Sequence, residues 1–193
     1  MSYIIDEEQL PDLFPTQNHD PAFWEALGRT IATFGYLEDV MRRAIFFFTG
    51  TAEPPAEDVE AATDKWLEKL DQVISDPLGP LIREYIKAIR VHRCQPNADI
   101  DDLDTRLKQC ARLRNALCHG SWGLPDGNNR SRLNYIEKRS GESMLDRIGV
   151  EFLNQTRTGT TELIVDVVNS VTILGYQFPG INGPGEIFWS EEQ

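Results

Sequence analysis

Arg114, Asn115 and His119 lie close together in the sequence and are followed directly by Gly120. A guanidinium can bind two oxygens of an oxyanion at once, and an imidazole gains and loses its proton near neutral pH. A side-chain amide between them can orient either group through hydrogen bonds. The pattern occurs often by chance, so it indicates anion binding with proton transfer only if the fold gives these side chains a special position.

Arg114 occupies the apolar side of a predicted helix. Apolar residues recur at helical spacing over residues 100–117, and Gly120 suits a left-handed conformation at the helix end. At about 100° per residue, the azimuth of Arg114 lies within roughly 60° of four of these apolar positions. The four are Leu103, Leu107, Cys110 and Leu117. We therefore expect the guanidinium to point toward the protein interior.

Glu38 has the same position on the first predicted helix, since Leu27, Ile31, Phe34 and Met41 surround its azimuth. Burying one unpaired charge costs several kcal/mol, so two opposite charges that face one interior are expected to meet. Two interpretations fit. Glu38 and Arg114 form a structural ion pair that orients the helices, or Arg114 faces an internal cleft in which it serves a function.

The elements that position these residues follow from composition and periodicity. The chain has 193 residues, of which 40% are hydrophobic and 26% charged, as is typical of one globular domain. We predict a mainly α fold, a bundle of about five helices with a small β-hairpin inserted before the last helix. The predicted helices cover about 20–50, 59–73, 81–89, 100–120 and 158–175.

The hairpin is predicted at about 132–153. Residues 121–131 are rich in Ser, Gly, Pro, Asp and Asn, which predicts a loop. The apolar residues on either side of Ser140-Gly141 alternate, namely Leu133, Tyr135, Ile148, Val150 and Phe152. The domain then spans 20–178, between an N-terminal arm (1–19) and a C-terminal tail (179–193).

The sequence resembles the HEPN superfamily at two short segments. The family signature is Arg, usually followed by Asn, with His four to six residues further on near the end of a core helix, as in Arg114, Asn115 and His119. The segment 34–38, Phe-Gly-Tyr-Leu-Glu, is similar to the first-helix segment of such proteins, with Glu38 as the acidic residue that faces the arginine. The resemblance covers about residues 20–176.

The resemblance implies a helical homodimer and, in active members, a metal-independent endoribonuclease. Arg114 would hold phosphate oxygens, Asn115 would position the phosphate or the histidine, and Glu38 would orient Arg114. His119 would act as base or acid, with the second His119 of the dimer in the other role, leaving a 2′,3′-cyclic phosphate. Such an enzyme could be a toxin controlled by an antitoxin protein, or a defence effector. The alternative is a non-catalytic HEPN-like domain that binds nucleotides or proteins.

The net charge of −12 repels polyanions and argues against a broad basic surface for nucleic acid. Binding of RNA must then be local. Arg83, Lys87 and Arg90 share one flank of their helix, and Arg112, Arg130 and Arg132 extend the set. These cations either bind a phosphate backbone or form an ordinary solvated surface. Trp122 either stacks on a base or packs under the hairpin.

Neither a metal nor a cofactor is expected. His92, Cys94, Cys118 and His119 lack the ligand spacing of a zinc site. The three cysteines show no disulfide pattern, and the longest apolar run, 44–48, is too short to cross a membrane. We therefore expect a cytoplasmic protein without a membrane segment.

Overall fold

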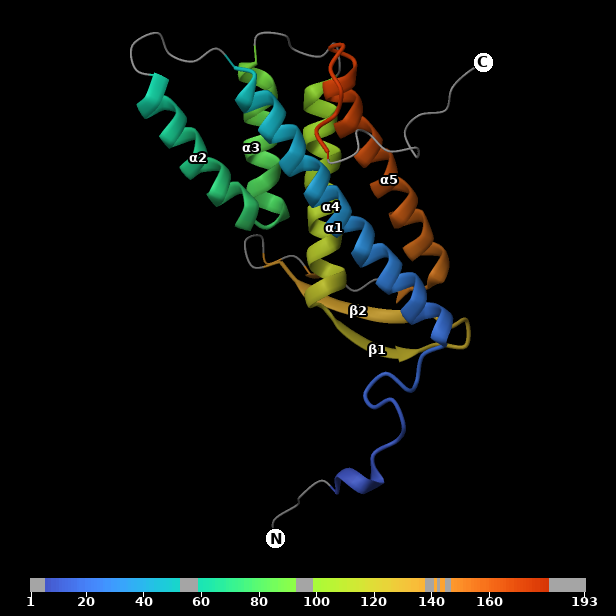
Figure 1. The fold of residues 1–193 in the computed structure, drawn as a ribbon. Coiled ribbons are helices and arrows are strands. Elements are labelled where there is room, and N and C mark those ends of the chain that lie inside the picture. Colours follow the sequence, from blue (N-terminus) through green and yellow to red (C-terminus); the bar gives the residue numbers. More distant parts are fainter. Residues whose placement is uncertain are drawn as a thin grey trace. The chain divides into compact units, whose positions relative to one another are not determined.

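The fold is mainly helical, as predicted, with five helices and a small antiparallel sheet before the last one (Figure 1). The computed structural model describes residues 6–52, 59–92, 99–137, 141, 143–144 and 147–180. In chain order the elements are η1 (Glu7–Gln9), α1 (Pro21–Gly50), α2 (Val59–Ser75), α3 (Leu78–Val91), α4 (Ile100–His119), β1 (Ser121–Pro125), β2 (Ser131–Ile136), β3 (Ser143–Met144), β4 (Arg147–Ile148) and α5 (Val150–Thr172). Within this part of the chain no helix is long and apolar enough to span a bilayer.

The chain divides into two compact units, described separately below. The sheet unit comprises Met1–Ile31 and Asn115–Thr156, and the helical unit comprises Ala32–Arg114 and Arg157–Gln193. The helices α1, α4 and α5 each contribute residues to both units.

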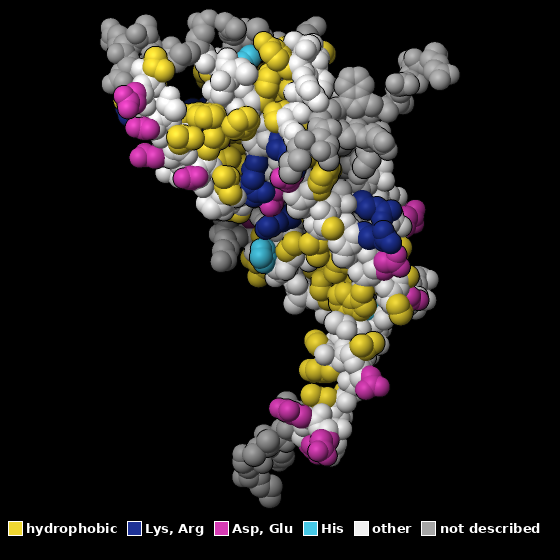
Figure 2. Space-filling view, viewed as in Figure 1, with side chains coloured by type: hydrophobic (Ala, Val, Ile, Leu, Met, Phe, Trp, Pro, Cys, Tyr) yellow, Lys and Arg dark blue, Asp and Glu magenta, His cyan; other side chains and the backbone are white. Residues whose placement is uncertain are grey.

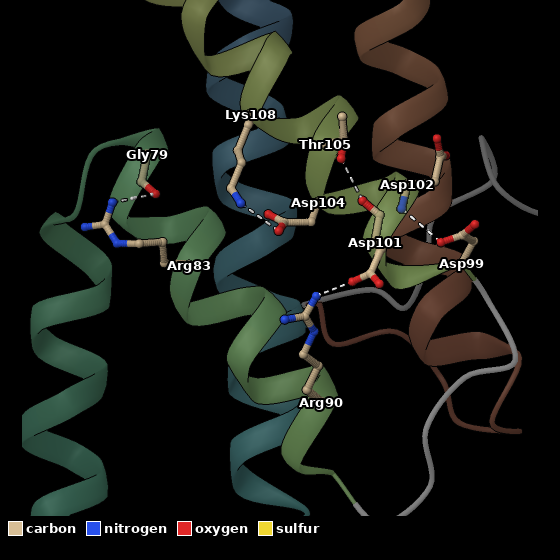
Figure 3. Close-up of polar contacts among 9 residues, drawn as sticks. All are labelled: Gly79, Arg83, Arg90, Asp99, Asp101, Asp102, Asp104, Thr105 and Lys108. Atoms are coloured by element: carbon tan, nitrogen blue, oxygen red, sulfur yellow. Dashed lines mark hydrogen bonds and ion pairs between the residues drawn. The ribbon is translucent and has the colours of Figure 1, made fainter. Parts of the chain in front are cut away.

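Two helix starts follow from aspartate caps. Asp20 Oδ1 accepts a hydrogen bond of 2.8 Å from the Ala22 amide at the start of α1, where the predicted helix 20–50 begins. Asp99 Oδ1 accepts a bond of 2.9 Å from the Asp102 amide at the start of α4 (Figure 3). These carboxylates satisfy amide groups that have no partner inside the helix, and so fix where α1 and α4 begin.

The core of the helical unit is formed by α1, α3, α4 and α5. Their apolar stripes meet in a set of side chains that are almost fully buried, including Leu37, Met41, Ile45, Tyr85, Ile89, Leu107, Val167 and Val171. The Tyr85 hydroxyl donates to Ser170 Oγ at 3.0 Å, which satisfies the polar end of a buried ring. By contrast α2 buries only Val73 among its residues. It lies alongside α3, to which it is tied by an ion pair of 2.7 Å between Lys69 and Glu84 (Figure 1).

In the sheet unit, β1 and β2 form an antiparallel hairpin in which Trp122 faces Leu133. The turn depends on Asp126, whose Oδ1 accepts hydrogen bonds from the amides of Asn128 (2.9 Å) and Arg130 (3.1 Å). These two hydrogen bonds lower the pKa of the Asp126 carboxyl, and the bond from the Arg130 amide has the larger effect. Asn129 adopts a positive φ of 54°, which asparagine tolerates in turns. The strands β3 and β4 also pair with β2.

The observed hairpin begins earlier in the sequence than the predicted one. The pairing of β2 with β4 joins residues 131–132 to 147–148, as the alternation suggested, but the main hairpin begins at Ser121, within the predicted loop. Val150 and Phe152, expected in a strand, belong to α5. Ser140, part of the predicted turn, lies outside the described residues.

The start of α5 was also predicted too late. The segment Thr158-Gly159-Thr160 indicated a helix start, yet α5 continues through it. The Thr156 and Thr161 hydroxyls donate to carbonyls one turn earlier, those of Phe152 (2.9 Å) and Arg157 (3.0 Å), so they do not compete for the helix amides. A glycine inside a helix costs only about 1 kcal/mol relative to alanine, which the packing of α5 can offset.

Gly120 ends α4 through close packing and not through a left-handed conformation. Among the described glycines only Gly141 and Gly175 have positive φ, the latter (82°) just after α5 where a helix end was expected. A Cβ on Gly120 would lie 2.5 Å from Leu133 Cδ1 and 2.6 Å from the Ala116 carbonyl oxygen. The chain leaves α4 for β1 at a point where only glycine fits.

We therefore expect Gly120→Ala to lower the free energy of unfolding by about 1–3 kcal/mol in urea titrations, because the buried Leu133 and a backbone oxygen must both move. Gly28→Ala is the matched control in the same unit. Its added Cβ meets nothing within 4 Å in α1, so it should leave stability unchanged or raise it by about 0.5–1 kcal/mol. Equal effects of the two substitutions would contradict the packing argument.

Candidate functional site

The Glu38 carboxylate of α1 lies between two guanidinium groups in the helical unit. Its Oε1 is 3.4 Å from Arg114 Nη2 of α4, and its Oε2 is 3.6 Å from Arg42 Nη2, one helical turn further along α1. The Glu38 side chain is 14% exposed, and both arginine side chains are 25% exposed. The predicted contact between Arg114 and Glu38 is thus confirmed, at a partly buried position.

The contact is an ion pair without hydrogen-bond geometry. Within the described part of the chain, the buried Oε1 of Glu38 accepts no hydrogen bond although Arg114 is 3.4 Å away. Arg42 Nη2 also donates to the Asp76 carbonyl at 3.2 Å. Two guanidinium groups and one carboxylate with a net formal charge of +1 therefore lie together.

Asn115 and His119 complete the signature on the same helix. Both belong to the sheet unit, whose boundary falls between Arg114 and Asn115. His119 is the last residue of α4 and is exposed, whereas Asn115 is partly buried beside the buried Ala116. The roles of Asn115 and His119 stay predictions.

Trp122 packs inside the sheet unit. Its ring meets Phe23 edge to face, with centroids 5.1 Å apart and an interplanar angle of 83°. The side chain is partly buried in β1. Of the two interpretations of Trp122, the structure supports packing and gives no support to base stacking.

The cations of α3 and α4 that were predicted to form a basic surface are exposed, and one of them is paired with a carboxylate. Arg83 and Lys87 are exposed on one flank of α3, where Arg83 Nη1 reaches the Gly79 carbonyl at 3.5 Å. Arg90, on the same flank, forms an ion pair with Asp101 at the start of α4 (Figure 3). Exposed Arg112 belongs to α4 of the same unit.

The other predicted cations, Arg130 and Arg132, belong to the sheet unit. Arg130 lies 3.5 Å from the Asp126 carboxylate, to which Arg147 is also paired. Among the predicted cations, Arg90 and Arg130 are thus paired with carboxylates.

No group of three or more potential metal ligands occurs in the described part of the chain. His92 is buried and contacts Thr51 Oγ1 at 3.1 Å, and Cys94 lies outside the described residues. Burial raises the pKa of the Cys110 thiol to about 11, so this cysteine remains protonated at neutral pH. Cys118, adjacent to His119, is exposed and is not disulfide-bonded.

A contact of the N-terminal arm went unpredicted. His19 Nε2 lies 2.6 Å from the hydroxyl of the fully buried Ser131 of β2, and the His19 ring stacks on Phe23 at 4.8 Å. Trp24 donates to the Thr16 carbonyl at 3.0 Å. The contact between His19 and Ser131 attaches the arm to the sheet. It joins residues 112 positions apart, which no local pattern in the sequence reveals.

Comparison with known proteins gives no relative, since no family model, no curated protein and no solved structure matches the chain.

The shared carboxylate predicts a stability effect. Glu38→Gln should lower the free energy of unfolding by about 1–3 kcal/mol in urea titrations, because two partly buried guanidinium groups lose their common counter-charge. Asp39→Asn is the matched control, as its pair with Arg43 has both side chains more than 40% exposed. It should cost less than about 0.5 kcal/mol. A loss from Asp39→Asn as large as that from Glu38→Gln would contradict the arrangement.

The docking of the arm predicts a pH dependence. Burial lowers the pKa of His19 below its ordinary value of 6.5, and a hydrogen bond with the Gly123 backbone acts in the opposite direction. The unfolded chain therefore binds a proton at His19 at a higher pH than the folded chain does. The free energy of unfolding keeps this contribution above about pH 6.5 and loses it as the pH falls through the lowered pKa. Urea titrations between pH 8 and pH 5 should show this loss for the wild type and a flatter profile for His19→Gln. Asn154→Ala, at an exposed position of α5 in the same unit, is the control and should keep the wild-type slope.

Proposed function

We propose that the protein is a metal-independent endoribonuclease of the HEPN type that acts as a homodimer. The observation that carries the proposal is the ion pair between Arg114 and Glu38, with α4 continuing from Arg114 to an exposed His119 at its end. A purely structural salt bridge explains the pair but leaves the histidine and the excess positive charge without a role.

The proposed reaction is transesterification within the RNA chain. One His119 accepts the proton of a ribose 2′-hydroxyl, and the 2′-oxygen forms a bond to the adjacent phosphorus. The bond from phosphorus to the 5′-oxygen breaks, and the second His119 of the dimer donates a proton to that oxygen. The products are a 2′,3′-cyclic phosphate and a free 5′-hydroxyl.

Arg114 stabilises the negative charge that develops on the phosphate oxygens, and Glu38 holds its guanidinium in place. Arg42, on the other side of Glu38, contributes to the positive charge of the same group of side chains. Asn115 positions the phosphate or His119. Arg83, Lys87 and Arg112 would supply contacts to the backbone of the substrate.

The setting of this activity belongs to the proposal as well. A HEPN-type ribonuclease of this size fits a cytoplasmic toxin held inactive by an antitoxin protein, or a defence effector. Either would have to restrict cleavage to a bound state or to a particular RNA, because free ribonuclease activity damages the cell that makes it.

The alternative is a non-catalytic HEPN-like domain that binds nucleotides or proteins. The net charge of −12, the neutralised Arg90 and the packed Trp122 favour it, since each reduces the capacity for binding RNA. In this case the pair between Glu38 and Arg114 only orients α1 and α4.

Incubating the full chain with RNA in EDTA tests the proposal. The wild type should release fragments that end in a 2′,3′-cyclic phosphate, and His119→Ala should reduce the rate by at least about 100-fold, the usual contribution of a general acid or base. Gln109→Ala, at an exposed position of α4, should cleave like the wild type.

Growth after induced expression separates the two candidate functions. A ribonuclease slows growth, and His119→Ala and Arg114→Ala should both relieve the effect. No cleavage by the wild type, or equal cleavage and equal growth with His119→Ala, would overturn the enzyme proposal and leave the binding domain.

A further inference from the structure

The helical unit contains a pocket of about 620 Å³ among α1, α2 and α3. This size lies within the range of small-molecule sites, about 300–1,000 Å³. Its apolar lining includes Phe48, Ala52, Ala62, Trp66, Ala88 and Val91. None of these residues belongs to the signature around Arg114.

Small side chains leave this space open. α2 buries only Val73, and the positions where α2 and α3 line the pocket include Ala62 and Ala88. At the end of α1, Gly50 allows Trp66 to approach closely, since a Cβ there would lie 3.2 Å from the indole ring. The pocket therefore exists because bulky residues are absent where α2 meets its neighbours.

Trp66 is fixed in position before any ligand binds. Its indole N–H donates to Thr49 Oγ1 at 2.9 Å, and its ring lies 5.5 Å from that of Phe46. Because the polar edge of the indole is already satisfied, Trp66 offers the pocket an apolar wall. A wall held in this way loses little conformational entropy on binding.

The polar lining of the pocket is cationic. It contains Lys65, Lys69 and Lys87 together with the buried His92, and no carboxylate is among the described residues that line it. Lys69 is paired with Glu84 at 2.7 Å, whereas neither Lys65 nor Lys87 forms an ion pair within contact distance in the described part of the chain. The hydrogen bond from Lys69 lowers the pKa of Glu84 more than burial raises it.

The charge of the surroundings makes this lining unusual. The chain carries a net charge of −12, and Figure 2 shows a row of acidic side chains along the outer edge of α2. The exposed acidic residues of α2 are Glu60, Asp64, Glu68 and Asp71. Positive charge is thus concentrated at the inner side of α2, beside an apolar pocket.

The same lysines line a second, polar pocket of about 390 Å³, in which Glu68, Asp76 and Glu84 are also present. A ligand with its apolar part against Trp66 would bring its polar end to the boundary between the two pockets. Lys65, Lys69 and Lys87 line both pockets, and the carboxylates of the second pocket disfavour an extended polyanion.

We propose that this pocket binds a small amphiphilic anion, with an apolar body against Trp66 and Ala62 and a single carboxylate or phosphate head near Lys65 and Lys87. The site shares Lys87 with the proposed contacts to RNA, but it does not depend on the ribonuclease function. Apolar burial supplies the binding free energy, and the lysines supply the selectivity for a negative head.

Three probes test the site on the full chain: 8-anilinonaphthalene-1-sulfonate as a fluorescent aromatic anion, decanoate as a carboxylate, and AMP as a phosphate. The dye should bind saturably with a rise in fluorescence, and at least one of the other two should displace it. Displacement by decanoate alone identifies a carboxylate head, and displacement by AMP alone identifies a phosphate head on an aromatic body.

Two variants locate the binding. Ala62→Leu fills the pocket and should weaken dye binding about tenfold, while Ala32→Leu makes the same change at an exposed position of α1 and should have no effect. Lys65→Gln should weaken dye binding about threefold, whereas Lys108→Gln, at an exposed position of α4, should leave it unchanged. Lys65 is itself exposed, so its variant keeps the test decisive if circular dichroism shows that Ala62→Leu is misfolded.

The proposal is overturned if neither decanoate nor AMP displaces the dye. It is also overturned if Lys65→Gln, or folded Ala62→Leu, binds the dye as tightly as its control variant does. Cleavage of RNA has no part in these measurements, so the outcome is independent of whether the ribonuclease proposal holds.

Discussion

The Glu38 carboxylate, shared by Arg42 and Arg114, is the constraint on which the helical unit and its candidate site both depend. Two arginines on the apolar sides of α1 and α4 would repel each other in a partly buried place, and one carboxylate between them allows both to remain. The contacts are long, at 3.4 and 3.6 Å. These separations are longer than those of a hydrogen-bonded salt bridge, so the pairing acts mainly through charge.

The helices could be predicted because each one carries its own information. Asp20-Pro21 and Gly50 bound α1, and the azimuth of Arg114 among the leucines of α4 was sufficient to predict its contact with Glu38. The prediction succeeded because a buried charge has few alternatives: it must find an opposite charge or a polar partner. Apolar periodicity determines which face of each helix is buried. The need to pair a buried charge then indicates that the faces of α1 and α4 that carry Glu38 and Arg114 meet.

The sheet unit was harder to predict because its determinants lie far apart in the sequence. The pattern Trp122-Gly123-Leu124-Pro125 has no clean alternation, and β1 becomes a strand through its pairing with β2 and the contact of Trp122 with Phe23 of α1. The bond between His19 and Ser131 is equally non-local. The prediction of where α5 begins was wrong for the opposite reason. The local signal at Thr158-Gly159-Thr160 was strong, and the packing of the whole helix outweighed it.

Charge distribution bears on both the proposed ribonuclease site and the proposed pocket. In a chain with a net charge of −12, long-range attraction of anions is absent, so any anion must be held by cations that act at short range. At Glu38 two arginines share one carboxylate, and in the pocket three lysines stand beside an apolar wall. The arginine group offers planar, bidentate contacts suited to a phosphodiester, whereas the lysines offer point charges suited to the head of a small amphiphile. The two proposed sites would therefore select different anions, although Lys87 lines the pocket and is also a proposed contact to RNA.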